Sequence, residues 1–533
     1  MPRPAVQWAN IFPKTKMSRL KRAIHGVASS YVALVATALY SLASIPVALH
    51  YLDKERFGLW ALMTTLVGYL SLVDASMSGS AGRLLIDHKD HRDSGRYGSF
   101  VQTVSLVTVV QGLIVLVVGL VLAGLFAQLL AIPAGLHAEF IRLVHLQCAA
   151  VALGFATRIF YLILTAHQRM DMVNYIATLG LAVNFATQWL FFHFGFGVLS
   201  LAWGALAAAL TLVICQWLAC EVQGLFPERG AWGKASWAHF KEIFDFGKDL
   251  FLVAVGTQLI MASQTIVITR VLGLPVAAVW SVGLRVFTMV TQVIGRISDM
   301  SMSAFAEMMV RGELARLRER YQTMVTLTAS LGGFAAVSFA LCNSLFIPLW
   351  THGKISWPAA NDVLLGAWLM VLAISRCHIS LVLLTKQIRF MRYVYFMEGL
   401  VFVTLSLLLA RLGGLPAIIG CSVVCGTVFS GAYCTWRVSR YFNLPLREVA
   451  WGWLQPMPKM LALYLPVAIL LWWTLTPLPG MVRLATHIVL AGSIGLGLFL
   501  RYGVPPALQK EILRRIPQRV YPVLRHVFAE PAS

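Results

Sequence analysis

Charged side chains are scarce in this 533-residue chain, and their scarcity excludes a water-soluble protein. Asp, Glu, Lys and Arg make up 12% of the residues, whereas soluble globular proteins contain roughly 25%. Hydrophobic residues make up 59%, and the mean hydropathy is +0.75. A chain of this composition cannot cover its own surface in water, and it is too apolar to be disordered. We therefore expect an integral membrane protein, for which the bilayer is the solvent.

Cysteines and enzyme motifs are also scarce. The eight cysteines all lie in hydrophobic stretches, which excludes a disulfide framework. Cys421 and Cys425 share a helix face but have no partner loop, so small packing residues are favoured over a metal site. The sequence contains no P-loop, so ATP does not drive the protein directly. We expect no metal, no cofactor and no enzymatic activity.

Long hydrophobic runs dominate what the sequence does contain. A membrane-spanning helix needs about 20 apolar residues, and fourteen segments meet this requirement. Some neighbouring spans are joined by turns of a few residues, such as Gly195–Gly197 and Gly413–Gly414. The predicted spans are 26–50, 57–80, 99–125, 141–165, 174–193, 197–219, 249–272, 274–296, 322–350, 362–385, 394–411, 415–436, 459–477 and 483–502.

The distribution of Lys and Arg predicts the orientation of these spans. The chain has 43 Lys and Arg against 22 Asp and Glu, a net charge of +21. Of the 43, 32 lie in the N-terminus, the C-terminal tail and alternate loops, whereas seven lie in the loops of the other side. Cytoplasmic loops collect Lys and Arg, so both termini are expected to be cytoplasmic. This rule explains the net positive charge without a nucleic-acid partner. The loops on the outer side are short, and they leave no room for a catalytic domain.

The two halves of the chain resemble each other at a shift of 220 residues. Residues 165–175 fall on 385–395, with the same spacing of Thr, Arg and Tyr. With a further shift of five, Asp-Ala-Ser-Met-Ser at 74–78 matches Asp-Met-Ser-Met-Ser at 299–303. These matches predict two six-span halves of the same orientation, with a cavity between them, an arrangement typical of transporters.

The spans and the repeat together predict the organisation of the chain. The fold class is an all-α integral membrane protein with about 14 transmembrane helices, in two parallel six-helix lobes plus two C-terminal helices. The predicted parts are a basic cytoplasmic N-terminus (1–25), an N-terminal lobe (26–220), a cytoplasmic linker (221–248), a C-terminal lobe (249–436), two extra helices (459–502) and a basic amphipathic cytoplasmic tail (503–533).

Short motifs at the span ends resemble a known family. Residues 51–62, Tyr-Leu-Asp-Lys-Glu-Arg-Phe-Gly-Leu-Trp-Ala-Leu, and the following 68–74 are similar to the start of the second span in polysaccharide-biosynthesis membrane proteins. These are the Wzx-type oligosaccharide flippases of the multidrug/oligosaccharidyl-lipid/polysaccharide (MOP) exporter superfamily. Residues 271–280 resemble the start of the family's eighth span, and 158–169 its junction of spans four and five. Asp53-Lys-Glu-Arg departs from the usual Gly-Pro, and two extra spans lengthen the chain.

The resemblance implies a two-lobed exporter in the bacterial plasma (inner) membrane. Its substrate would be a lipid-(pyro)phosphate-linked oligosaccharide, flipped by alternating access between the lobes, with polysaccharide-assembly proteins as partners. An alternative fold is open, because residues 82–96 faintly resemble a loop of major facilitator transporters, which also have twelve spans and parallel halves.

Cationic residues within the predicted spans are candidates for substrate binding, because a charge in the bilayer is costly unless it faces a cavity or a partner. Arg285 lies near the middle of span eight, and Arg296 lies at its end. Arg158 and Arg376 occupy near-equivalent positions in spans four and ten. Arginine grips phosphate bidentately and stays charged, so the four residues are expected to line a cationic cavity. For Arg158, Arg376 and Arg296 the alternative is snorkelling to cytoplasmic headgroups.

Acidic residues in the spans leave a second function open. The first span holds no acid and the seventh holds only Asp249, where the resemblance implies a carboxylate in an ion-coupled drug exporter. Glu398, Asp299 and Asp74 are possible ion-coupling or ion-pair residues, and Glu398 or Asp299 could pair with Arg285. The alternative function is therefore an ion-coupled drug or metabolite antiporter of the same superfamily.

Two basic segments predict contact with membrane lipids. Residues 307–320 and 507–528 alternate Arg or Lys with apolar residues. This pattern is typical of amphipathic helices on an anionic cytoplasmic membrane surface. Solvated charge that follows the topology rule is the alternative.

Overall fold

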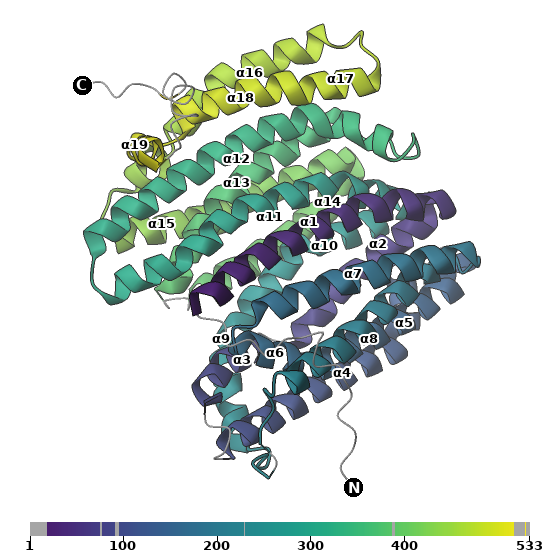
Figure 1. Ribbon diagram of the computed structural model, residues 1–533. Coiled ribbons are helices and arrows are strands. Elements are labelled where there is room, and N and C mark those ends of the chain that lie inside the picture. Colours follow the sequence, from purple (N-terminus) through teal and green to yellow (C-terminus); the bar gives the residue numbers. More distant parts are fainter. Residues whose placement is uncertain are drawn as a thin grey trace. The chain divides into compact units, whose positions relative to one another are not determined.

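The fold is entirely helical in the part of the chain that the structure describes (Figure 1). The computed structural model describes residues 19–74, 77–90, 95–228, 230–385, 390–515 and 528. Most of the predicted basic N-terminus and much of the predicted tail lie outside the described residues. Within these residues, thirteen helical segments are long and apolar enough to cross a bilayer. The prediction of an all-α, multi-pass membrane protein is confirmed.

One of the thirteen segments contains two of the predicted spans. Met391–Tyr441 has 51 residues, and as one straight helix it would be about 76 Å long, more than twice the hydrocarbon thickness of about 30 Å. Gly414 interrupts this segment with φ 58° and ψ −142°, a conformation that glycine adopts without a steric penalty. The segment is therefore two helices joined at the predicted Gly413–Gly414 turn, which accounts for the fourteenth span.

The chain forms two compact units. Unit 1 comprises Met1–Gln258 and Gly273–Ala278, and unit 2 comprises Leu259–Leu272 and Val279–Ser533. The helices of unit 1 are α1 (Arg19–Tyr51), α2 (Lys54–Leu70), α3 (Met77–His88), α4 (Arg96–Leu129), α5 (His137–Ala156), α6 (Arg158–Ala166), α7 (Met170–His193), α8 (Leu199–Val222) and most of α9 (Trp237–Met261).

Small residues bring the helices of unit 1 close together. α4 packs on α5, α5 on α8, α8 on α7, and α7 on α1 (Figure 1). At Gly112 of α4, an added Cβ would lie 2.6 Å from the carbonyl oxygen of Ala152 in α5. Close backbone approach of this kind is the usual way in which membrane helices associate.

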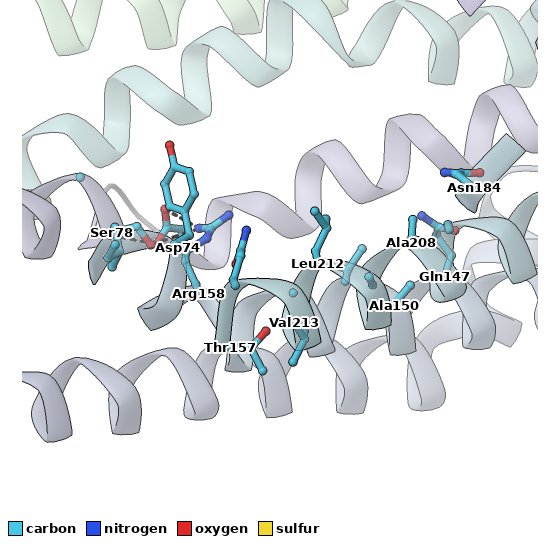
Figure 2. A pocket seen from close by; sticks show the side chains of 18 residues that line it. Asp74, Ser78, Gln147, Ala150, Thr157, Arg158, Asn184, Ala208, Leu212 and Val213 are labelled. Atoms are coloured by element: carbon cyan, nitrogen blue, oxygen red, sulfur yellow. Dashed lines mark hydrogen bonds and ion pairs between the residues drawn. The ribbon is translucent and has the colours of Figure 1, made fainter. Parts of the chain in front are cut away.

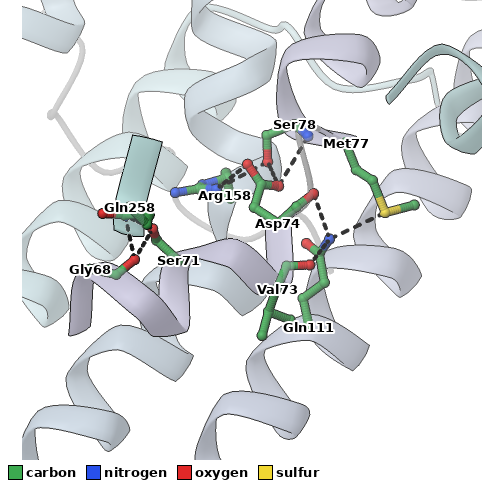
Figure 3. Close-up of polar contacts among 9 residues, drawn as sticks. All are labelled: Gly68, Ser71, Val73, Asp74, Met77, Ser78, Gln111, Arg158 and Gln258. Carbon is green, nitrogen blue, oxygen red and sulfur yellow. Dashed lines mark hydrogen bonds and ion pairs between the residues drawn. The ribbon is translucent and has the colours of Figure 1, made fainter. Parts of the chain in front are cut away.

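The predicted span 57–80 is broken in two. α2 is followed by a 3₁₀ turn, Ser71–Asp74, before α3 begins. Gln111 of α4 stabilises this break, because its Nε2 donates to the carbonyl oxygens of Val73 (3.2 Å) and Asp74 (3.4 Å) (Figure 3). Gln258 supports the preceding turn, with its Nε2 2.6 Å from the carbonyl oxygen of Gly68. These side chains supply donors to carbonyl groups at the end of α2, where intrahelical partners run out.

The predicted span 141–165 is also broken. α5 ends at Ala156, and Thr157 has φ −108° and ψ 8°. α6 then begins at Arg158. The break places Arg158 in the first turn of a new helix, close to the break between α2 and α3.

Unit 2 contains the second half of the repeat and the two extra spans. α12 packs on α13, α13 on α14, and α14 on α10. The extra spans form α16 and α17–α18, which pack on α12 (Figure 1). Its helices are α10 (Ser263–Leu272), α11 (Leu274–Val310, beginning in unit 1), α12 (Leu314–Trp350), α13 (Ala359–Leu384), α14 (Met391–Gly426), α15 (Ala432–Tyr441), α16 (Pro456–Thr474), α17 (Gly480–Thr486), α18 (Gly492–Leu498) and α19 (Pro506–Arg515).

The prediction of one amphipathic helix over 307–320 is wrong. α11 continues to Val310, and the chain turns at Gly312, whose φ is 72°, before α12 begins. The basic residues of this segment therefore lie on two helices and the turn between them. Periodicity alone missed the turn because a single glycine is tolerated inside many helices.

Candidate functional site

A cavity of about 690 Å³ lies within unit 1, lined by residues of α3, α5, α6, α7 and α8 (Figure 2). Its volume falls in the range of about 300–1,000 Å³ that is common for small-molecule sites. Alanine, valine and leucine side chains form most of the wall, and polar groups gather at its two ends. The labelled polar residues are Asp74, Ser78, Thr157 and Arg158 toward one end and Gln147 and Asn184 toward the other (Figure 2).

Arg158 is held at one end of the cavity by Asp74 and Ser78 (Figure 3). Its Nη1 lies 3.0 Å from the Asp74 carboxylate and donates to the Ser78 hydroxyl at 3.1 Å. The Ser78 hydroxyl and backbone N–H both donate to Asp74, at 2.6 Å and 3.1 Å. The guanidinium also lies 4.5 Å from the centre of the Phe155 ring, a cation–π distance.

Part of the Arg158 guanidinium is available to a ligand. A guanidinium has five N–H donors, and the Nη2 and Nε donors bond to none of the described residues. The side chain is 33% exposed, whereas the Asp74 side chain is 19% exposed. Asp74 and Ser78 therefore fix the orientation of a partly exposed cation that lines the cavity.

A second arginine–aspartate pair occurs in unit 2. Arg376 of α13 donates from Nη2 to both oxygens of Asp299 on α11, at 2.9 Å and 3.1 Å. Asp299 matches Asp74 of the first half in the repeat, and Arg376 lies at a position nearly equivalent to that of Arg158. In unit 2, α11 and α13 continue unbroken through the pair. The repeat predicted the equivalence of these positions, whereas the bonds between them come from the structure.

The structure excludes one predicted ion pair. Arg285 and Asp299 lie fourteen residues apart on the continuous helix α11, which places them about 21 Å apart along the axis. Arg285 is half-buried. It belongs to unit 2 and does not line the cavity of unit 1, so its role as a substrate-binding residue stays a prediction.

The other predicted site residues lie in unit 2. Arg296 is exposed on α11, and Arg376 is exposed on α13. Glu398 is 2% exposed in α14, and its Oε2 accepts a bond from the backbone N–H of Ser430 at 3.0 Å. Ser430 lies in a π-helical turn, Thr427–Gly431, a deviation that frequently occurs at functional sites. Of the four predicted arginines, only Arg158 lines the cavity.

Two amide side chains at the other end of the cavity were not predicted. Gln147 of α5 is 9% exposed, and its Oε1 is buried without a hydrogen-bond partner among the described residues. Asn184 of α7 accepts bonds at Oδ1 from Gln188 and from the Tyr40 hydroxyl, the latter at 3.4 Å. The sequence contained one indication of this site, because Gln147 and Asn184 are polar amides within predicted membrane spans.

A buried acid of unit 2 was also missed. Asp362, in the first turn of α13, has no exposed surface. Its Oδ1 accepts bonds from Trp357 Nε1 at 2.6 Å and Asn343 Nδ2 at 2.8 Å. These bonds tie the start of α13 to α12 and to the preceding loop, which indicates a structural role.

Comparison with known proteins identifies the family and the fold. Residues 50–353, more than half of the chain, match the family described as polysaccharide biosynthesis protein. No curated protein matches the chain in sequence. An inward-facing multidrug resistance MATE family transporter of the MOP superfamily has a TM-score of 0.66 and 12% identity, over 76% of this chain and 96% of that chain.

Two further solved structures share the fold. The lipid II flippase MurJ, in an inward closed conformation, has a TM-score of 0.65 and 11% identity, over 89% of this chain and 98% of that chain. A MOP superfamily transporter from Pyrococcus furiosus has a TM-score of 0.51 and 15% identity, over 80% and 95%. These likenesses favour the MOP fold over the major facilitator alternative. The chain therefore belongs to the polysaccharide biosynthesis protein family and has the fold of the MOP superfamily transporters.

Proposed function

We propose that this protein flips a lipid-(pyro)phosphate-linked oligosaccharide across the bacterial plasma membrane, by alternating access between lobes 26–220 and 249–436. The observation that carries the proposal is the Arg158 guanidinium, held by Asp74 and Ser78 at one end of a largely apolar cavity. The family description supports a carbohydrate-linked substrate.

Phosphate recognition follows from the chemistry of this ion pair. In the empty cavity, Asp74 balances the charge of Arg158 and lowers the cost of placing a cation within the membrane. An incoming phosphate can use the Nη2 and Nε donors, which bond to none of the residues that the structure describes, in a bidentate contact. The low dielectric of the protein interior strengthens this attraction. Binding would then weaken the ion pair between Asp74 and Arg158. Because Asp74 lies between α2 and α3, substrate binding could change the packing of these two helices.

The orientation of the protein in the membrane, its lipid contacts and its partner proteins follow from the same function. Both termini would be cytoplasmic, as the distribution of Lys and Arg predicts. The basic residues of segments 307–320 and 507–528 would contact anionic lipids. Polysaccharide-assembly proteins would act before and after the flipping step.

The test is the sidedness of lipid-linked oligosaccharide in a deletion strain, measured by labelling the glycolipid from the outer face. Cytoplasmic accumulation that the intact gene relieves would support the proposal. R158A should reach the membrane in folded form but fail to relieve the accumulation. R158K should relieve it in part, because lysine keeps the charge but lacks the forked guanidinium that binds phosphate bidentately. Normal export in the deletion strain would overturn the proposal.

One observation favours a second candidate function, an ion-coupled drug or metabolite antiporter. Glu398 is a buried carboxylate opposite a π-helical turn, a setting in which proton binding could change the packing of α14. E398Q would then abolish drug resistance conferred by the gene, whereas a flippase that does not use Glu398 would be unaffected. Drug sensitivity of the deletion strain, measured beside glycolipid sidedness, separates the two functions.

A further inference from the structure

The unit 1 cavity has a second polar end, away from Arg158. Gln147 lies on α5, and Arg158 lies eleven residues later, at the start of α6. Figure 2 shows Gln147 and Asn184 together at the opposite end of the cavity from Asp74, Ser78 and Arg158. A single bound molecule that touched both ends would have to be elongated, with different chemistry at its two ends.

The amide end offers both kinds of hydrogen-bonding group. Gln147 lines the cavity, and its buried Oε1 has no partner among the described residues, so a turn of the amide about its last torsion would present this acceptor to a ligand. Asn184 Oδ1 is occupied by Gln188 and Tyr40, so the groups that Asn184 can offer a ligand are the donors on Nδ2. A hydroxyl group is one donor and two acceptors, and an acetamido group also combines a donor with an acceptor. Neutral hydroxyl or acetamido groups therefore match this end better than a phosphate does.

The position of Asn184 is fixed by close helix packing. At Gly204 of α8, an added Cβ would lie 2.7 Å from Asn184 Oδ1. The glycine therefore lets α8 approach α7 and confines the Asn184 side chain. The adjoining cavity wall, Ala205, Ala208 and Ala209, is made of small side chains, which leave room for a ring-sized ligand and present apolar surface to its C–H groups.

We propose that Gln147 and Asn184 form a carbohydrate subsite, which binds hydroxyl or acetamido groups of the lipid-linked sugar while Arg158 binds its phosphate. This inference rests on the proposed function and adds to it a residue-level basis for sugar recognition. The phosphate would lie toward the predicted cytoplasmic ends of the spans, and the sugar would extend along α5 toward the middle of the bilayer.

The effect of Gln147 on the stability of the ligand-free protein distinguishes a binding role of this residue from a structural role. A buried polar atom without a partner destabilises the empty protein. Methionine has a similar length and no hydrogen-bonding demand, so Q147M should raise the melting temperature of the empty protein. A residue that served only the fold would lose stability on the same replacement. Stability and binding should therefore change in opposite directions.

The experiment measures binding of two probes to the purified full-length protein in detergent. The first probe is the glycolipid that accumulates in the deletion strain, and the second is polyprenyl pyrophosphate, which has no sugar. Q147M should raise the Kd for the glycolipid about tenfold, as the loss of one to two hydrogen bonds implies, and leave the Kd for polyprenyl pyrophosphate unchanged. R158A should raise both. Q128M, on the exposed end of α4, is the matched control and should change neither.

The outcomes separate the subsite from the proposed function. Equal binding of the glycolipid by Q147M and wild type, or equal weakening for both probes, would overturn the subsite and leave the flippase proposal standing. Failure of the wild-type protein to bind either probe would overturn the proposed function and the subsite with it. If Q147M does not yield folded protein by size-exclusion chromatography, the stability prediction is wrong, and Q147A then supplies the comparison of the two probes.

Discussion

The Arg376 guanidinium lies 2.9 Å from the Asp299 carboxylate in unit 2 and repeats the pairing of Arg158 with Asp74 at 3.0 Å in unit 1. The two pairs differ in their surroundings. The side chains of Arg376 and Asp299 are 57% and 46% exposed, against 33% and 19% for Arg158 and Asp74. Water screens the pair of Arg376 and Asp299 more strongly, so we expect this ion pair to be weaker than the pair of Arg158 and Asp74.

Double-mutant cycles should reveal this difference. Alanine substitutions of Arg376 and Asp299 should show a coupling free energy of about 0–1 kcal/mol, as for other exposed pairs. The cycle for Arg158 and Asp74 should give a larger value, because the pair is less exposed and Ser78 bonds to both partners. The measurement is the free energy of unfolding in detergent for each single and double variant. Equal coupling in the two units would contradict the argument from exposure.

Arg285 provides a test of the cationic site predicted from the sequence. Arg285→Ala should abolish glycolipid flipping without loss of folded protein. A half-buried arginine within a membrane span destabilises the protein, so we expect it to be present for substrate binding. Arg311→Ala is the control, because Arg311 is exposed and pairs with Glu307 one turn away. Outer-face labelling of the glycolipid measures both variants. Normal flipping by Arg285→Ala would remove this residue from the site.

The membrane spans and the repeat could be predicted from the sequence because both depend on composition along the chain. The 3₁₀ turn Ser71–Asp74 could not, because it depends on Gln111 from another helix, which donates to the carbonyl oxygens of Val73 and Asp74. Gln147 was missed for a related reason. A neutral amide in a span carries no charge signal, and its unpartnered oxygen becomes evident only when neighbouring helices are in place.

Asp362 should be important for stability. Its removal leaves Trp357 Nε1 buried without its acceptor, and such a group costs about 1–3 kcal/mol. Asn343 Nδ2 loses one acceptor but still donates to the Gly283 carbonyl oxygen at 3.3 Å. D362A should therefore destabilise the protein by about 1–3 kcal/mol. D362N keeps an acceptor oxygen and should cost less. Thermal unfolding in detergent measures both, and an unchanged melting temperature for D362A would contradict the structural role.

The interruption at Gly414 predicts where the chain crosses the membrane. If Met391–Tyr441 holds two spans, a reporter enzyme fused at Gly414 should be active on the outer side. A fusion at Leu444 should report the cytoplasm, because the second span returns the chain to its starting side. Paired fusions of an outside-active and a cytoplasm-active reporter measure this directly. The same sidedness at both positions would reduce the span count to thirteen and shift the predicted location of the C-terminus.

Two glycines of α4 should respond in opposite ways to the same substitution. In Gly112→Ala the new methyl group would lie 2.6 Å from the carbonyl oxygen of Ala152 and 3.2 Å from the backbone nitrogen of Ala156. Backbone atoms cannot rotate away, so α4 and α5 must separate, at a cost of about 1–3 kcal/mol.

In Gly124→Ala no atom lies within 4 Å of the new methyl group in the described structure, and helix propensity should stabilise the protein by up to about 1 kcal/mol. Melting temperatures of the two variants in detergent provide the comparison. Because α5 forms one wall of the cavity, Gly112→Ala should also weaken glycolipid binding, whereas Gly124→Ala should leave it unchanged. A loss of stability in both variants would mean that glycine is needed for its backbone freedom in α4, and would contradict close packing on α5 as the cause.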